Sequence, residues 1–194
     1  MGSKLEQTVL DIYNAATIPT TWDGTLTETE INGWLGSELP AKFPETLPEN
    51  FKDPRVWLQA NELTIAGRYS YKDLRGILVG KFDLFCTDQP NQVAVRIGSI
   101  KLGVVPVPVT QFADTITESL QQSGYESSWS TQDGDPVLLV NIPDDHLVIQ
   151  ENYRVVVKSF DIQEKSIFIA GETVEFDPAA EGSEEHEPVQ LYGQ

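Results

Sequence analysis

The sequence contains one cysteine, Cys86, among 194 residues, and this excludes an internal disulfide. The fold must therefore be held by a hydrophobic core, and a chain of this length can bury one without disulfide bonds. Cys86 ends the mostly apolar run FDLFC at residues 82–86, so we interpret it as a buried, unreactive thiol. The scarcity of cysteine does not fix the compartment, because many envelope proteins lack disulfides.

Long hydrophobic runs are also missing. No apolar run approaches the ~20 residues that a membrane-spanning helix needs, and no signal peptide is visible. Met1-Gly2-Ser3 is typical of a start added before an internal residue, so an upstream membrane anchor could precede Lys4 in the full-length protein.

Basic residues are scarce: 13 Lys and Arg stand against 30 Asp and Glu, and the net charge is −17 at pH 7. Nucleic-acid binding needs a basic surface, so this composition excludes nucleic acid as a partner. The imbalance is uneven, since residues 52–103 carry 8 bases and 5 acids, a local charge of +3. Charges scattered on solvated strand faces would explain this excess, and so would a site for an anionic head group.

Catalytic and cofactor motifs are absent from the sequence, which has no GxGxxG, Walker A, GxSxG, HExxH or CxxC pattern. There are two histidines, and His186 lies in an acidic C-terminal stretch. Asp144, Asp145 and His146 follow Pro143 in one tight turn and could contact a cation, but Asp and Pro are ordinary turn residues. We therefore predict a non-enzymatic protein with no catalytic residue, no cofactor and no metal site.

The clearest local signal is a helix start at residues 26–31, LTETEI. Thr27 can cap the helix and Glu30 can return the hydrogen bond, while Leu26 and Ile31 stand where a hydrophobic staple needs them. We predict a helix that begins here and ends before Pro40.

A period of two follows from residue 55 and predicts strands. The longest cover residues 76–86 and 92–102, joined by a turn at residues 88–91, and residues 68–75 are predicted to form another turn. These segments indicate an antiparallel meander.

The stretch SIKLGVVPVPVTQF, residues 99–112, leads from a strand through two prolines into a helix. Pro106 and Pro108 cannot donate to a strand ladder, so we place this stretch at a sheet edge or between elements. Thr110 is the expected N-cap of a helix that ends at Gly124. We expect the valines between the prolines and beside them to be buried beneath that helix.

These elements, with a first helix over residues 4–15 and further strands over residues 137–176, predict an α+β fold. We expect a long, curved antiparallel β-sheet, a meander, with two or three helices packed on one side. Residues 1–178 are assigned to a single domain, and residues 179–194, which are small, acidic and polar, to a disordered tail.

Four residues are candidates for contact with an apolar ligand: Trp57, Val105, Val107 and Trp129. Trp57 is out of phase with its apolar neighbours, so it points to the other side of its strand, and Trp129 is set among polar residues. Several strands are apolar on both faces, which indicates either a sheet covered on both sides or an apolar groove. The sequence does not decide between these alternatives.

The segment INGWL at residues 31–35, the long strands, and the junction IGSIKLGVVPVPV at residues 97–109 together resemble a known family. They are similar to the uncharacterised, membrane-anchored YpmS-like ectodomains of bacteria, which distantly resemble tubular lipid-binding proteins. The resemblance implies an extracytoplasmic α+β domain that is membrane-anchored in the full-length protein, and it transfers no catalytic residue. Ile31 stands where that family usually has leucine.

The leading hypothesis for function is therefore an envelope-associated, non-enzymatic domain that binds a lipid or another apolar ligand. The alternative is a structural or protein-interaction domain with no small ligand. A hydrolase or metal enzyme has little support, and the oligomeric state is left open.

Overall fold

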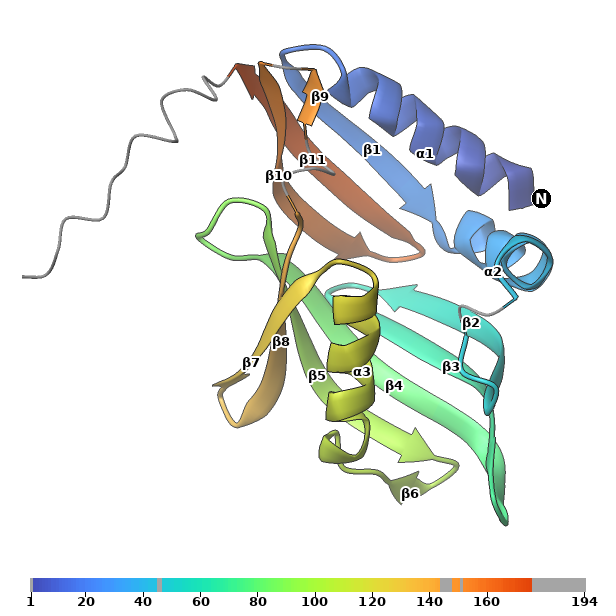
Figure 1. Ribbon diagram of the computed structural model, residues 1–194. Coiled ribbons are helices and arrows are strands. Elements are labelled where there is room, and N and C mark those ends of the chain that lie inside the picture. The colour runs from blue at the N-terminus through green and yellow to red at the C-terminus, as the bar shows by residue number, and fades with distance from the viewer. Residues whose placement is uncertain (1, 45–46, 144–147, 151, 176–194) are drawn as a thin grey trace, which may run out of the picture.

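The computed structural model describes residues 2–44, 47–143, 148–150 and 152–175. These residues form two antiparallel sheets and three helices (Figure 1), which confirms the predicted α+β class and its long antiparallel sheet. The turn containing His146, the residue His186 and the predicted tail lie outside the described residues. The assignment of residues 1–178 to one domain stays a prediction.

The larger sheet has the order β2-β3-β4-β5-β8-β7, with β6 paired to β5 outside this path. Its strands are β2 (Phe51–Gln59), β3 (Glu62–Tyr71), β4 (Leu74–Cys86), β5 (Gln92–Leu102), β6 (Val105–Pro106), β7 (Glu126–Gln132) and β8 (Asp135–Asn141). The smaller sheet has the order β1-β11-β10-β9 and consists of β1 (Thr21–Thr27), β9 (Val148–Gln150), β10 (Tyr153–Gln163) and β11 (Ser166–Glu175). The helices are α1 (Gly2–Ala16), α2 (Glu28–Lys42) and α3 (Thr110–Gln122).

The meander of β2 to β5 follows the predicted order, but one predicted turn is wrong. The ladder between β3 and β4 continues to the pair Tyr71 and Leu74, so the connection is only Lys72-Asp73. Lys72 has a φ of 53°, which a tight two-residue hairpin turn requires. The polar and charged residues of this region lie on the exposed side of a long hairpin rather than in a wide loop.

Helix α2 begins as predicted. The hydroxyl of Thr27 accepts a hydrogen bond from the Glu30 N–H, and the Glu30 carboxylate accepts one from the Thr27 N–H, which completes the capping box. The predicted end before Pro40 is wrong, because the helix continues to Lys42. Pro40 cannot donate to the carbonyl four residues before it, but the last turn still closes because the Phe43 N–H donates to the Leu39 carbonyl at 2.9 Å.

Side chains of α2 block the free edge of β2. Asn32 donates through Nδ2 to the Val56 carbonyl at 2.8 Å and accepts through Oδ1 from the Val56 N–H at 2.9 Å. Glu28 Oε2 accepts from the Leu58 N–H at 2.8 Å. Backbone groups of this edge strand are thus satisfied by the helix, which protects the edge from pairing with another chain.

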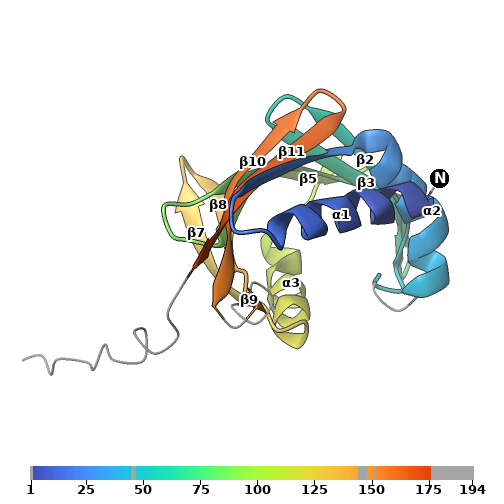
Figure 2. The same cartoon turned by 90° about the horizontal axis from the view of Figure 1, so that it is seen from above.

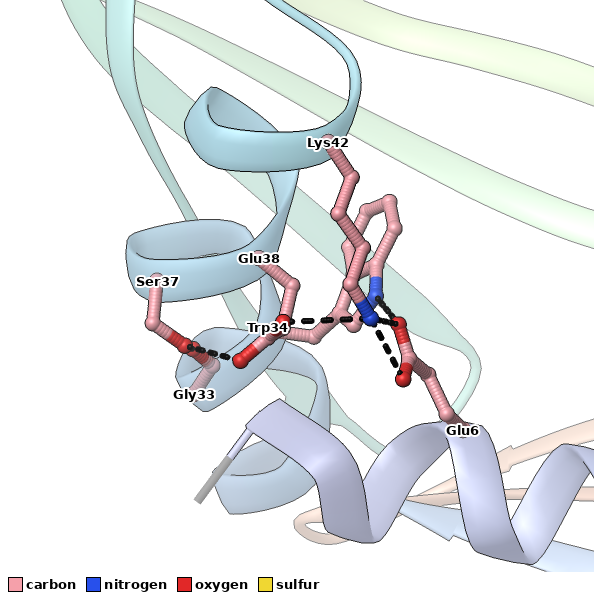
Figure 3. A network of polar contacts seen from close by, with 6 residues as sticks. All are labelled: Glu6, Gly33, Trp34, Ser37, Glu38 and Lys42. Carbon is pink, nitrogen blue, oxygen red and sulfur yellow. Dashed lines mark hydrogen bonds and ion pairs between the residues drawn. The ribbon is translucent and has the colours of Figure 1, made fainter.

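Helix α1 packs on the smaller sheet and is joined to α2. The buried residues Ala16, Trp22 and Val155 form the core of this contact. Gly171 has no room for a Cβ because the Trp22 ring lies against it. Glu6 of α1 accepts from Trp34 Nε1 at 3.1 Å and pairs with Lys42 Nζ at 2.6 Å, as Figure 3 shows.

The smaller sheet was not anticipated from the sequence. Strand β1 ends at the predicted helix start and was not predicted as a strand, whereas β10 and β11 fall within residues 137–176, where strands were predicted. In the view from above, α1 and α3 lie on the same side of the two sheets (Figure 2).

Candidate functional site

The strand register gives the larger sheet one continuous apolar face. Trp129 pairs with Leu138, Leu138 with Val95, and Val95 with Leu84, across β7, β8, β5 and β4. Directly paired residues share a face, and successive residues of a strand alternate between faces. The face defined by Trp129, here called the apolar face, also carries Val56, Leu58, Leu63, Ile65, Leu78, Phe82, Val93, Ile97, Ile100, Leu102 and Val140.

The opposite face of the larger sheet carries the charged side chains of the central strands. Arg96 pairs with Asp83 at 2.6 Å, and Lys81 pairs with Glu62 at 2.7 Å, on this side. This face also carries apolar side chains, and three of them, Ala66, Ala94 and Val137, are buried. The charged side chains of β3, β4 and β5 all lie on it and are directed away from the apolar face.

Burial of the apolar face is incomplete. Leu58 and Ile97 are almost fully buried, with exposed fractions of 1% and 2%. Val56, Ile100 and Leu138 are buried as well. The partly buried side chains of this face are Leu63, Ile65, Leu78, Phe82, Leu84, Val93, Val95, Leu102, Val140 and Trp129. Burial therefore leaves these ten side chains partly accessible.

Helix α3 lies over this face and is fixed at one side of it (Figure 1). Trp129 Nε1 donates to Thr117 Oγ1 at 3.1 Å, and the α3 backbone lies closest to β7 among the strands. Phe112, Ile116 and Leu120 recur at helical spacing on α3, but no residue of Thr110–Gln122 is buried. An amphipathic helix that sealed a sheet would bury these side chains.

The ends of α3 differ partly from expectation. Gly124, with a φ of +82°, follows the last turn as predicted. Thr110 is the first helical residue rather than the N-cap, and the cap position, Val109, provides no side-chain hydrogen bond to the described helix.

The structure does not bring the four predicted ligand residues together. Trp57 lies on β2 on the opposite face and is 49% exposed, whereas Trp129 lies on β7, with β3, β4, β5 and β8 between them. Val107 is half-buried, and its N–H donates to the Ile100 carbonyl at 2.9 Å. The expected burial beneath the helix is wrong for Val105, which is 61% exposed and lies in β6, the two-residue strand that pairs with the end of β5.

A basic depression at the end of the larger sheet was missed as a site. It is open, has a volume of about 790 Å³, and is lined by Lys52, Arg68, Tyr69, Ser70, Lys72, Arg75, Gly76 and Ile77. The local charge excess of residues 52–103 indicated it. The sequence does not show that these cations meet at one end of three strands, because they are far apart along the chain.

Groups able to perform covalent or metal chemistry are few. Burial raises the pKa of the Cys86 thiol, against the opposing effect of a hydrogen bond with the Phe160 backbone, and this disfavours the reactive thiolate. The thiol is half-buried rather than fully buried. No group of three His, Cys, Asp or Glu side chains that could hold a metal ion occurs within residues 2–44, 47–143, 148–150 and 152–175.

Comparison with protein-family models, curated proteins and solved structures gave no significant match. The resemblance to YpmS-like ectodomains is therefore neither supported nor refuted.

Proposed function

We propose that this protein is a non-enzymatic lipid-binding domain, and that its apolar face beneath α3 holds an acyl chain or a similar apolar ligand. The observation that carries this proposal is the partial exposure of that face. Leu63, Leu78, Leu84 and Val95 point to the side on which α3 lies, yet none of them is buried. Side chains that served only as core would be expected to be buried.

The chemistry of the face favours an acyl chain over a polar ligand. The paired residues of β3, β4, β5 and β8 that point to this side include no charged side chain. An acyl chain gains about 25 cal/mol per Å² of apolar surface removed from water and needs no hydrogen-bond partner. A polar substrate would leave its own groups unpaired on such a surface.

We further propose that the domain works in the bacterial cell envelope, held at the membrane by an N-terminal anchor in the full-length protein. This part of the proposal rests on the resemblance of residues 31–35 and 97–109 to YpmS-like ectodomains. Within the part of the chain that the structure describes, no helix is long and apolar enough to cross a membrane.

The alternative is a structural or protein-interaction domain without a small ligand. One observation favours it: Val9, Leu10 and Tyr13 of α1 are exposed, with exposed fractions of 48%, 49% and 55%. Exposed apolar residues grouped on one helix can form a docking surface for another protein.

Native mass spectrometry of protein purified from cells tests the proposal directly, and a co-purified lipid is the expected result. Binding of a fluorescent fatty acid should then be roughly tenfold weaker in Leu78→Gln. Val79→Gln is the matched control, because Val79 is the next residue on β4, is also half-buried, and points to the opposite face. A folded protein that binds neither lipid nor fatty acid would instead support the interaction domain.

A further inference from the structure

The far end of the larger sheet combines two hairpin tips. The β3–β4 turn and the β5–β6 turn lie at the same end of the sheet, away from the smaller sheet (Figure 1). They are joined where the Gly103 N–H donates to the Ile77 carbonyl at 2.8 Å. We call this region, residues 68–77 and 101–106 with residues 52–53 of β2, the tip.

The tip exposes apolar side chains. Val104 is 92% exposed, Val105 61%, Leu74 59%, Tyr71 50% and Ile77 48%. Tyr71 and Leu74 are a cross-strand pair, and the Gly103 hydrogen bond brings the Val104 turn beside Ile77. By their strand pairs, Tyr71, Leu74 and Val105 lie on the side of the apolar face, whereas Ile77 lies on the opposite face. The two adjacent hairpins thus expose apolar side chains on both sides of the tip, and such a concentration of exposed apolar groups marks an interaction site.

Cations also gather at the tip in an otherwise acidic protein, and those on its strands share the face of Ile77. The tip holds five basic residues, and they are Lys52, Arg68, Lys72, Arg75 and Lys101. Three carboxylates lie in the same region, those of Glu49, Asp53 and Asp73. Asp53 pairs with Arg68. Glu49 precedes Asn50, whose carbonyl accepts from the Ser70 N–H of β3. Five cations against three carboxylates leave a charge of +2 here, whereas the whole chain carries −17.

Most of these cations are available to a partner. Lys72 lies over the Tyr71 ring at 5.1 Å, which places a cation directly beside the exposed apolar residues. Among the described residues, Lys52, Lys72, Arg75 and Lys101 form no ion pair. Lys52, Lys72 and Arg75 also line the open depression described above.

We propose that the tip docks on the surface of a bilayer that contains anionic phospholipids. Exposed apolar side chains enter the interface between head groups and acyl chains, and flanking Lys and Arg side chains bind the anionic head groups. A soluble anion would explain the cations but not the exposed Val104 and Leu74. The acidic remainder of the protein is repelled by the same surface, so the tip is the part that approaches it.

The exposed residues that carry this proposal, Leu74, Val104 and the cations of the tip, are not among those named for the apolar face. Docking requires the exposed tip, whereas acyl-chain binding requires the half-buried apolar face, and fatty-acid binding is measured without vesicles. Failure of one is therefore distinguishable from failure of the other.

Co-sedimentation with vesicles of phosphatidylcholine alone, or of phosphatidylcholine with phosphatidylglycerol, tests the docking. We expect binding to the anionic vesicles only, and weaker binding at high salt. Lys72→Gln/Arg75→Gln should bind about thirtyfold more weakly, from the usual contribution of each cation near an anionic surface. Leu74→Ser/Val104→Ser should also lose binding, and circular dichroism should show both variants folded because all four side chains are exposed.

Two matched controls carry the same changes elsewhere. Lys81→Gln/Lys158→Gln removes two exposed cations outside the tip, and Val9→Ser/Leu10→Ser removes two exposed apolar residues of α1. Both should bind like the parent protein. Three results would overturn the proposal. The control variants could lose as much binding as the tip variants, or the protein could bind neutral vesicles equally well. Inorganic phosphate, added at constant ionic strength, could displace the protein from the vesicles.

Discussion

The side chain of Asn91 joins the two sheets through the backbone around Val157. Asn91 Oδ1 accepts from the Val157 N–H at 2.9 Å, and Nδ2 donates to the Val155 carbonyl at 3.1 Å. The Asn91 carbonyl also accepts from the Ile142 N–H, so three segments meet at this residue. Asn91 is only 7% exposed and has a φ of 57°, which asparagine tolerates better than most residues.

Replacing Asn91 by glycine should lower the free energy of unfolding by about 1–3 kcal/mol, because a buried carbonyl and a partly buried N–H of β10 lose their partner. Glycine also accepts the positive φ, so the loss of stability would come from the missing carboxamide and not from backbone strain. Denaturation by urea measures the change.

Asn61→Gly is the matched control for this substitution. Asn61 has a φ of 61° in the turn between β2 and β3, and its side chain forms no hydrogen bond to a described residue. It should be close to neutral. Equal effects at both positions would mean that the Asn91 carboxamide contributes nothing to the contact between the sheets.

The capping box of α2 should make the protein less stable in acid. The Thr27 N–H, then the Thr27 hydroxyl, and then Lys4 lower the pKa of Glu30 below its ordinary 4.5, although burial opposes this. A carboxyl whose pKa is lower in the folded state stabilises that state above the ordinary pKa, and this contribution is lost as the pH falls through the folded value. Stability measured by urea denaturation should therefore fall below pH 4.5.

Glu30→Gln should flatten this acid dependence, because glutamine can keep a capping hydrogen bond but does not titrate. Glu118→Gln on the exposed side of α3 makes the same change in net charge and serves as the control. If both variants show the parent's dependence on pH, the loss of stability in acid has another origin.

The contact between α1 and α2 gives a prediction that nuclear magnetic resonance can check. Lys42, then Trp34, lower the pKa of Glu6 through hydrogen bonds to its carboxylate (Figure 3). The titration of the Glu6 carboxyl should have its midpoint below 4.5, and Lys42→Gln should move the midpoint back toward that value. An unchanged midpoint would show that α1 and α2 are not held together at this point in solution.

Much of the local structure could be predicted because its causes are local. Thr27 and Glu30 are three residues apart, so the capping box is visible in the sequence, and the alternation in residues 92–102 matches β5 at both ends. The continuous apolar face could not be predicted in this way. It depends on the register between β4, β5, β8 and β7, and alternation within one strand does not give that register.

The parts that could not be predicted depend on contacts between distant residues. Strand β1 has the polar sequence TWDGTLT, and it is a strand because residues 166–172 of β11 pair with it. Likewise Pro40 was predicted to end α2, whereas the helix is held by contacts that extend past it to Lys42 and Glu6. The basic tip requires Lys52 of β2, Lys72 of the β3–β4 turn and Lys101 of β5 to lie at one end of the sheet, and only the local charge excess indicated it.

The two valines beside Pro106 now allow a sharper test than either would give alone. Val107 is half-buried and Val105 is 61% exposed, although they are two residues apart in the same stretch. Val107→Asp places a charge in partly apolar surroundings and should lower the free energy of unfolding by about 1–3 kcal/mol, less than full burial of a charge would cost. Val105→Asp should be nearly neutral for stability, since its carboxylate remains in water.

Urea denaturation and fatty-acid binding, measured on both variants, distinguish a structural role of Val107 from a role in ligand binding. A Val107→Asp protein that is as stable as the parent but no longer binds the fatty acid would place Val107 on the ligand site instead of in the support of α3.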